Sequence, residues 1–126
     1  MQKSFVKEFK LYCKKKNLDV NSHQIKLIKI LEEYYKLNYK SFISKILSKK
    51  NYKKGFYLYG DVGVGKTMIL EFFFNLVEGK KLKLHFNEFM LSFHDFVHQS
   101  KDKNDENKIS KFVKKLKSKA KLIYFD

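Results

Sequence analysis

The sequence has no arginine, no proline and no tryptophan, although lysine provides 28 of its 126 residues and the formal net charge is +15. Arginine is the side chain best suited to paired hydrogen bonds with phosphates and with the edges of nucleic-acid bases. Its absence therefore argues against sequence-specific recognition of DNA or RNA. Lysine, asparagine, isoleucine, tyrosine and phenylalanine are abundant, and all have A/T-rich codons. We therefore interpret part of the positive charge as a compositional bias.

Cysteine and long apolar segments are scarce as well. The single cysteine, Cys13, excludes an internal disulfide framework and is typical of a reducing compartment. We predict that it is a small buried residue on a helix face. The N-terminus lacks the apolar run of about 7–15 residues that a secretory signal needs, and no stretch reaches the roughly 20 apolar residues that span a membrane. These absences predict a cytoplasmic protein.

Apolar residues at helical spacing predict three helices in the first 50 residues. Their stripes are Phe5, Phe9 and Tyr12 or Cys13, then Ile28, Leu31 and Tyr35, then Phe42, Ile43, Ile46 and Leu47. Asn21 followed three residues later by Gln24 resembles a capping arrangement, which predicts that the second helix starts there.

After residue 54 the pattern changes to one that predicts a parallel α/β sheet. The run Gly55–Gly60 consists of β-forming residues between two glycines, which predicts a strand buried on both faces. Further strands are predicted at 82–86 and 121–126. Residues 100–108 contain no apolar side chain and are predicted to be a solvated loop. The helices between the strands carry Met68, Ile69, Phe72, Phe73 and Leu76, ending near Gly79; Phe89, Met90, Phe93 and Val97; and Ile109, Phe112, Val113 and Leu116.

Residues 60–67 read GDVGVGKT, which is the pattern G-x-x-x-x-G-K-[ST] of a phosphate loop. The pattern predicts that backbone N–H groups and the N-terminus of the following helix form a cradle for phosphate. Lys66 would reach the β- and γ-phosphates, and the Thr67 hydroxyl would bind Mg²⁺. The predicted nucleotide-binding residues are Gly60, Asp61, Val62, Gly63, Val64, Gly65, Lys66, Thr67 and Met68.

A second acid for Mg²⁺ is expected where another buried strand ends, because it would face the phosphate loop across the carboxyl edge of the sheet. Asp126 directly follows the apolar run Leu122–Phe125 and fits that description. We therefore predict a site for ATP and Mg²⁺ with Thr67 and Asp126 as the metal-binding side chains. No catalytic residue is predicted, because in many hydrolytic ATPases the base follows this aspartate, and Asp126 is the last residue of the sequence.

Three segments of the chain resemble, in the same order, successive motifs of the ZapE family of AAA+ ATPases, which includes a bacterial cell-division ATPase and its mitochondrial relatives. The segments are GFYLYGDVGVGKTMILEFFF, KLHFNEFMLSFHDFVH and KLIYFD. Two positions depart from the family pattern, since Asn21 stands where aspartate is usual and Asp61 where glycine is usual. The most specific part of the resemblance is the block with His85, Phe86, Phe89, Met90 and His94.

The resemblance implies an α/β P-loop domain of the AAA+ type, with residues 1–50 as an N-terminal helical segment and 51–126 as the first part of the ATPase domain. It implies ATP hydrolysis that remodels a protein partner, either cell-division ring polymers in bacteria or clients of mitochondrial quality control. The fourth and fifth strands of such a sheet, the sensor residue and the arginine finger have no counterpart in the sequence. We therefore expect a truncated ATPase that binds nucleotide at most, with homo-oligomers only in the full-length form. A bacterial cytoplasmic location is favoured over the mitochondrial matrix.

Two other functions are compatible with the sequence. A nucleic-acid-associated P-loop protein of the helicase-loader type would share the loop and the positive charge, whereas a non-catalytic module would use the N-terminal helices to bind a partner. Nucleic acid is the less expected partner, because we interpret the lysine runs at 14–16, 49–50 and 114–115 as solvated faces. His94 and His98 lie one helical turn apart, but we expect structural or partner-facing roles for them rather than Zn²⁺ binding.

Overall fold

The computed structural model describes residues 4–39, 54–60 and 65–126, and the chain divides into two compact units, Met1–Val77 and Glu78–Asp126. The boundary predicted near residue 50 lies outside the described residues and stays a prediction. The third predicted helix, with Phe42, Ile43, Ile46 and Leu47, lies outside them too. Within the described ranges, no helix combines the length and the apolar character needed to cross a membrane.

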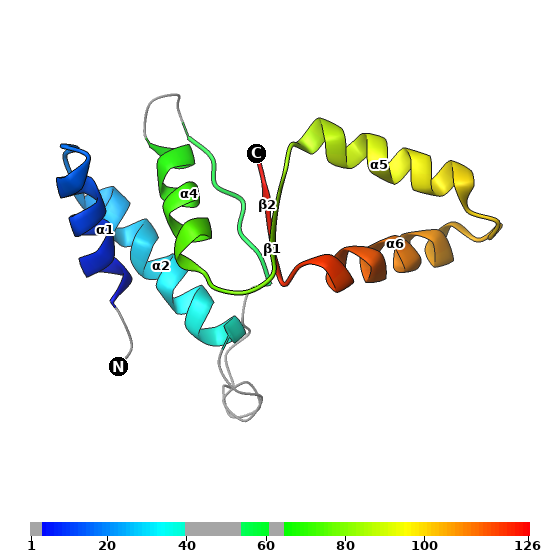
Figure 1. Ribbon diagram of the computed structural model, residues 1–126, viewed down its shortest axis with the longest axis horizontal. Helices are drawn as coiled ribbons and strands as arrows, with labels where there is room; N and C mark the ends of the chain where they lie inside the picture. Colours follow the sequence, from blue (N-terminus) through cyan, green and yellow to red (C-terminus); the bar gives the residue numbers. More distant parts are fainter. Residues whose placement is uncertain (1–3, 40–53, 61–64) are drawn as a thin grey trace. The chain divides into compact units, whose positions relative to one another are not determined.

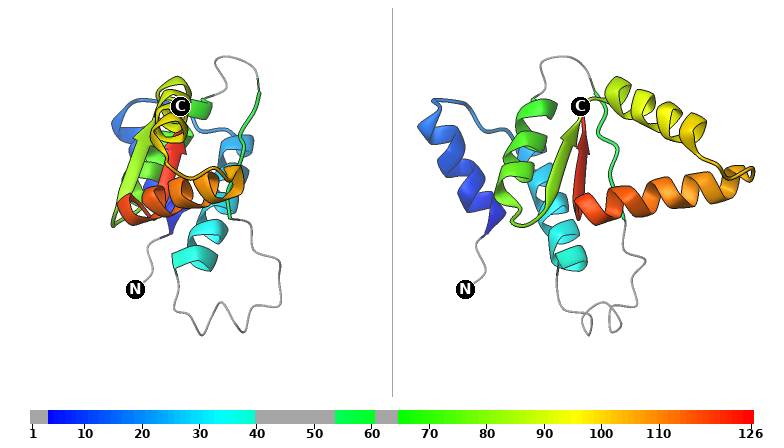
Figure 2. Two further views of the ribbon diagram at one scale, coloured as in Figure 1. Left: turned by 90° about the vertical axis from the view of Figure 1, so that its right-hand side faces the viewer. Right: turned by 45° about the vertical axis from the view of Figure 1, so that its right-hand side comes forward.

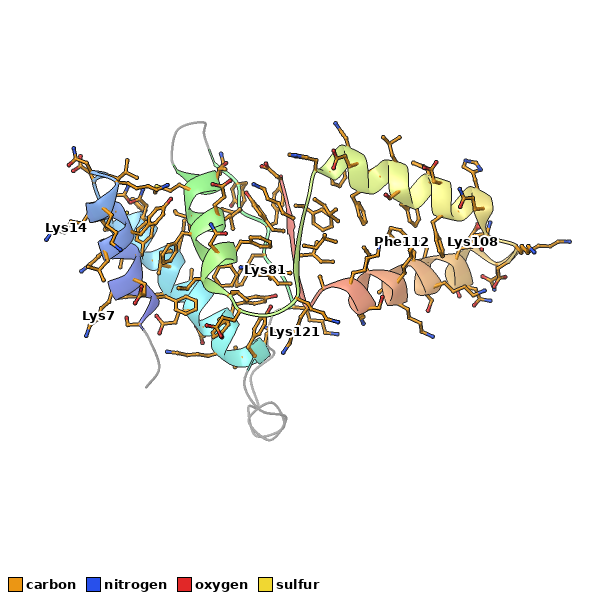
Figure 3. All side chains as sticks on the ribbon, in the orientation of Figure 1. Lys7, Lys14, Lys81, Lys108, Phe112 and Lys121 are labelled. Atoms are coloured by element: carbon orange, nitrogen blue, oxygen red, sulfur yellow. The ribbon has the colours of Figure 1, made fainter. Side chains whose placement is uncertain are left out.

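The helices described in the first unit are α1 (Phe5–Lys15), α2 (Ser22–Tyr39) and α4 (Lys66–Leu76) (Figure 1). The predicted apolar stripes are confirmed as its core: Phe5, Phe9 and Cys13 of α1, Ile28 and Leu31 of α2, and Ile69, Phe72 and Phe73 of α4 are buried. The rings of Phe9 and Phe72 meet edge to face with their centroids 5.2 Å apart. Lys7 and Lys14 point outward from α1 into solvent (Figure 3), as expected for a solvated lysine face.

The N-terminus of α2 is held by a reciprocal pair of hydrogen bonds, as the spacing of Asn21 and Gln24 predicts. Asn21 Oδ1 accepts from the backbone N–H of Gln24 at 2.9 Å, and Gln24 Oε1 accepts from the backbone N–H of Asn21 at 3.1 Å. Helix starts leave such backbone donors without helical partners, so this capping box satisfies two of them. The same bonds hold the Gln24 side chain in one place.

The second unit contains the strands β1 (Lys81–Leu84) and β2 (Leu122–Phe125) and the helices α5 (Phe86–Gln99) and α6 (Asp105–Lys119). The two strands pair in parallel, and Leu84 lies opposite Phe125, so both strands end at the same edge (Figure 2). A parallel pair needs a crossover connection, which the hairpin of α5 and α6 provides. The predicted alternation of parallel strands and helices is therefore confirmed within this unit.

Phe112 of α6 is the centre of the aromatic core of the second unit. It points toward α5 (Figure 3), where its ring centroid lies 5.2 Å from that of Phe93, 5.4 Å from Phe96 and 5.7 Å from Phe89. Phe112 is buried, as the predicted stripe requires. Ile109 and Val113 of the same stripe are 50% and 39% exposed. The predicted stripe is therefore only partly buried.

Two predicted boundaries in the second unit are wrong. Phe86 begins α5 instead of ending a strand, because His85, at φ −74° and ψ 136°, is the N-cap at which the chain leaves the sheet. The solvated loop predicted at 100–108 is shorter, because α6 already starts at Asp105. There the Asn104 side chain accepts a hydrogen bond from the backbone N–H of Glu106 at 2.9 Å. This polar cap starts the helix one turn before its first apolar residue.

The prediction of a buried strand at Gly55–Gly60 is wrong as well, since these residues form no strand. The segment contacts α2, where the Tyr34 hydroxyl donates to the Lys54 carbonyl at 3.1 Å and the rings of Tyr34 and Phe56 lie 5.0 Å apart. Tyr57 and Tyr59 are more than four-fifths exposed, at 88% and 81%. A strand exists only when a neighbour exchanges backbone hydrogen bonds with it, and in the described residues β1 and β2 pair only with each other.

Candidate phosphate-binding site

The described end of the predicted phosphate loop forms the N-terminus of α4. Gly65 directly precedes the helix and has φ +81° and ψ 21°, which is the left-handed region that favours glycine. Its carbonyl accepts the first helical hydrogen bond, from the Ile69 N–H at 3.0 Å. The N–H groups of the first turn of a helix have no helical partner and carry partial positive charge. The start of α4 therefore has the partial positive charge that favours an anion, and phosphate binding there stays a prediction.

The side chain of Lys66 folds back across the loop. Its ammonium group donates a hydrogen bond to the carbonyl of Gly60, the residue at the other end of the loop. Thr67 is exposed on the first turn of α4, and Met68 beside it is half-buried. The cation and the hydroxyl are thus both on the first turn of α4. The remaining predicted loop residues, Asp61, Val62, Gly63 and Val64, lie outside the described residues.

Gln24 of α2 lies against the last glycine of the loop. A Cβ atom on Gly65 would meet Gln24 Nε2 at 3.3 Å and the Met68 methyl carbon Cε at 3.5 Å. The positive φ therefore favours glycine here, and a Cβ atom would also crowd the end of the Gln24 side chain. Analysis of the sequence assigned Gln24 to the helix cap and to the family resemblance, but not to the nucleotide site. The contact joins residues far apart along the chain, and no local pattern in the sequence signals it.

Asp126 is held at the edge where β1 and β2 both end. Its N–H donates to the Leu84 carbonyl at 2.9 Å, and its own carbonyl accepts from the Phe86 N–H at 3.2 Å. Its carboxylate lies 3.9 Å from Nδ1 of His85, and the two side chains are 38% and 65% exposed respectively. Asp126 thus presents an accessible carboxylate from a backbone position that two hydrogen bonds define.

The two predicted Mg²⁺ ligands belong to different units, Thr67 to the first and Asp126 to the second. Both offer the hard oxygen atoms that Mg²⁺ prefers. Their binding to one ion stays a prediction. In the described ranges, no group of three histidine, cysteine, aspartate or glutamate side chains is arranged to hold a metal.

A comparison with known protein families assigns most of the chain to one family. Residues 12–126 match the model of a family described as AFG1-like ATPase. The chain belongs to the AFG1-like ATPase family. Membership confirms the resemblance found in the sequence motifs and makes the fold class that of a P-loop NTPase. An ATPase family implies the use of a nucleotide, and nucleotide binding at this loop stays a prediction.

Individual relatives support the same family. Lactation elevated protein 1 homolog B of Danio rerio is 42% identical over 67 residues, which cover 52% of this chain and 13% of the relative. Cell division protein ZapE of Escherichia coli is 31% identical over 74 residues, which cover 58% of this chain and 19% of the relative. The chain thus spans less than a fifth of these AFG1-like ATPases and their homologues. No solved structure matches it.

Proposed function

We propose that this member of the AFG1-like ATPase family binds ATP together with Mg²⁺ at the loop that leads into α4. The contact of the Lys66 ammonium group with the Gly60 carbonyl carries the proposal. It holds a cation across the loop, at the N-terminus of an 11-residue helix whose first turn also carries the Thr67 hydroxyl.

Each residue has a separate part in this proposal. Lys66 would exchange the Gly60 carbonyl for oxygens of the β- and γ-phosphates, which form stronger, charge-assisted hydrogen bonds. The backbone N–H groups at the start of α4 would bind phosphate, and Thr67 would provide an oxygen ligand for Mg²⁺. Asp126 would approach the same ion from the end of β2.

Titration of the purified chain with a fluorescent ATP analogue, with and without Mg²⁺, tests the proposal. We expect Lys66→Ala to weaken binding by about tenfold or more, since a hydrogen bond to a charged group contributes roughly 1.5–3 kcal/mol. Lys7→Ala is the matched control, because it removes the same charge from an exposed position on α1. Equal affinities of the two variants, or no binding by the unmodified chain, would contradict the proposal.

For a full-length member of the family, we propose ATP hydrolysis coupled to remodelling of a protein partner. One relative is named a cell division protein, which supports a component of the division ring as the client. We propose that this chain supplies nucleotide binding, that hydrolysis requires further parts of an ATPase domain, and that homo-oligomers form only in the full-length protein. The proposed location is the bacterial cytoplasm.

If the chain were instead a partner-binding module without nucleotide chemistry, its function would depend neither on Lys66 nor on ATP. Its partner would bind equally well to the unmodified chain and to Lys66→Ala, and removal of ATP would leave the affinity unchanged. A helicase-loader type of protein would bind DNA with an affinity that falls steeply with salt concentration. Pull-down of the division-ring component, with and without ATP, and a DNA titration at two salt concentrations separate these functions.

A further inference from the structure

Gln24 is the buried polar side chain of the described core, with only 8% of its surface exposed. Its Oε1 atom accepts the hydrogen bond from the Asn21 N–H. Its Nε2 atom, which carries two N–H donors, has no hydrogen-bond partner among the described residues. Every fully buried side-chain nitrogen and oxygen in those residues has a partner, so Nε2 reaches solvent. One end of the amide is thus fixed, and the other is available to a ligand.

The available end of Gln24 lies at the phosphate loop. Nε2 and the Met68 methyl carbon both lie within 3.5 Å of the point where a Cβ on Gly65 would be. A hydrogen-bond donor and an apolar, polarisable thioether therefore flank the last glycine of the loop. Small-molecule sites combine apolar walls with a few fixed polar groups, and a methionine sulfur makes favourable contacts with aromatic rings.

We propose that Nε2 of Gln24 donates a hydrogen bond to a ring nitrogen of the nucleotide base, with Met68 packed against the base. The inference rests on the proposed nucleotide binding. The phosphates already have Lys66 and the backbone donors at the start of α4, so we assign Gln24 and Met68 to the base. Because Asn21 occupies Oε1, the Gln24 amide offers a donor, which matches the acceptor nitrogens of the base.

The capping box makes Gln24 suited to this role. A free glutamine side chain loses rotamer freedom when it binds a ligand, and that loss weakens binding. Here the bond from the Asn21 N–H to Oε1 already fixes the side chain, at 3.1 Å. Asn21 is therefore a positioning residue in this proposal, and Gln24 is the residue that contacts the base.

The test compares three ligands that share a triphosphate: ATP, ribose 5-triphosphate and inorganic tripolyphosphate. The affinities of the unmodified chain and of Gln24→Met are measured with Mg²⁺ by calorimetry, and circular dichroism checks that each variant is folded. Gln24→Glu is the second variant, since glutamate also serves at this position of a capping box. Its added charge repels all three ligands alike, so the ratio of affinities isolates the contact with the base.

We expect Gln24→Met to weaken ATP binding by roughly three- to tenfold, as one neutral hydrogen bond predicts, and to leave the other two ligands within about twofold. Equal losses for all three ligands would show that Gln24 acts on the loop itself, and losses for ATP and ribose 5-triphosphate would assign the contact to the ribose. Either result, or no loss, would overturn the inference while leaving nucleotide binding in place. Failure of the unmodified chain to bind tripolyphosphate or ATP would instead overturn the proposed function and this inference together.

Discussion

A methyl group on Gly65 would lie 3.3 Å from Nε2 of Gln24, although one residue precedes α4 and the other is on α2. This distance is short for a contact of a Cβ atom. An alanine at position 65 would also have to adopt φ +81°, a conformation that costs an L-residue roughly 1–2 kcal/mol. A side chain at position 65 would therefore strain the backbone before α4 and crowd Gln24, which caps α2.

Gly65→Ala is expected to lower the free energy of unfolding by about 1–2 kcal/mol, because it adds backbone strain and crowds Gln24. Urea unfolding monitored by circular dichroism measures the change. Gly55→Ala is the control, because nothing lies within 4 Å of a Cβ at that position, and we expect a change within about 0.5 kcal/mol. Equal stabilities of the two variants would contradict the described packing.

Phe9 is completely buried in the first unit, where its ring meets that of Phe72. Phe9→Ala removes the ring and leaves a cavity, so we expect a loss of about 3–5 kcal/mol in the free energy of unfolding. Leu11→Ala truncates an apolar side chain on the same helix that is 53% exposed, and we expect a much smaller effect. Thermal unfolding of both variants checks the difference, and similar midpoints would show that α1 does not pack as described.

Asp102 stabilises the turn before α6 in a pH-dependent way. The Asn104 N–H, which donates to Asp102 at 3.1 Å, and the Lys111 ammonium group at 3.2 Å hold the pKa of this carboxyl below its ordinary value of 3.8. Because the folded pKa is the lower one, the stabilisation is complete above the unfolded pKa and is lost as the pH falls through the folded pKa.

We therefore expect the Asn104 amide signal in NMR spectra to be constant from neutral pH down to about pH 5 and to shift below pH 4, as Asp102 is protonated. Asp102→Asn should abolish this titration. Lys111→Ala should move its midpoint upward, toward the ordinary value. Asp105→Asn is the control, since Asp105 lies in the first turn of α6 and its carboxylate contacts Lys108 instead of the Asn104 N–H. A midpoint above 3.8 in the unmodified chain would contradict the described contacts.

Local patterns in the sequence were sufficient to predict the helices that the structure describes, the parallel pair and the capping box of Asn21 with Gln24. Helical periodicity reflects which side chains share one face, and that face becomes buried whatever it packs against. The start of α6 was predicted too late, because Asn104 caps it through a polar side chain that an apolar pattern omits. The phosphate-loop motif likewise predicted that a helix follows the loop, and α4 begins directly after Gly65.

Features that depend on distant residues were not predictable in the same way. The segment 55–60 has the composition of a strand, but strand formation requires a hydrogen-bonding neighbour, and composition says nothing about whether one is present. The place of Gln24 beside Gly65 depends on how α2 packs on α4. The capping pattern describes only the bonds of Gln24 within its own turn, so its role at the candidate site became visible only in the structure.

The backbone of Asp126 donates to Leu84 and accepts from Phe86, so the final residue of the sequence is bonded on both sides to the chain around the end of β1. An amide hydrogen that is held in a hydrogen bond exchanges with solvent only when that bond opens. We therefore expect the Asp126 amide hydrogen to exchange when the end of the strand pair opens. Its exchange rate is therefore an intrinsic probe of sheet opening at the carboxylate proposed to bind Mg²⁺, and it needs no label or added chromophore.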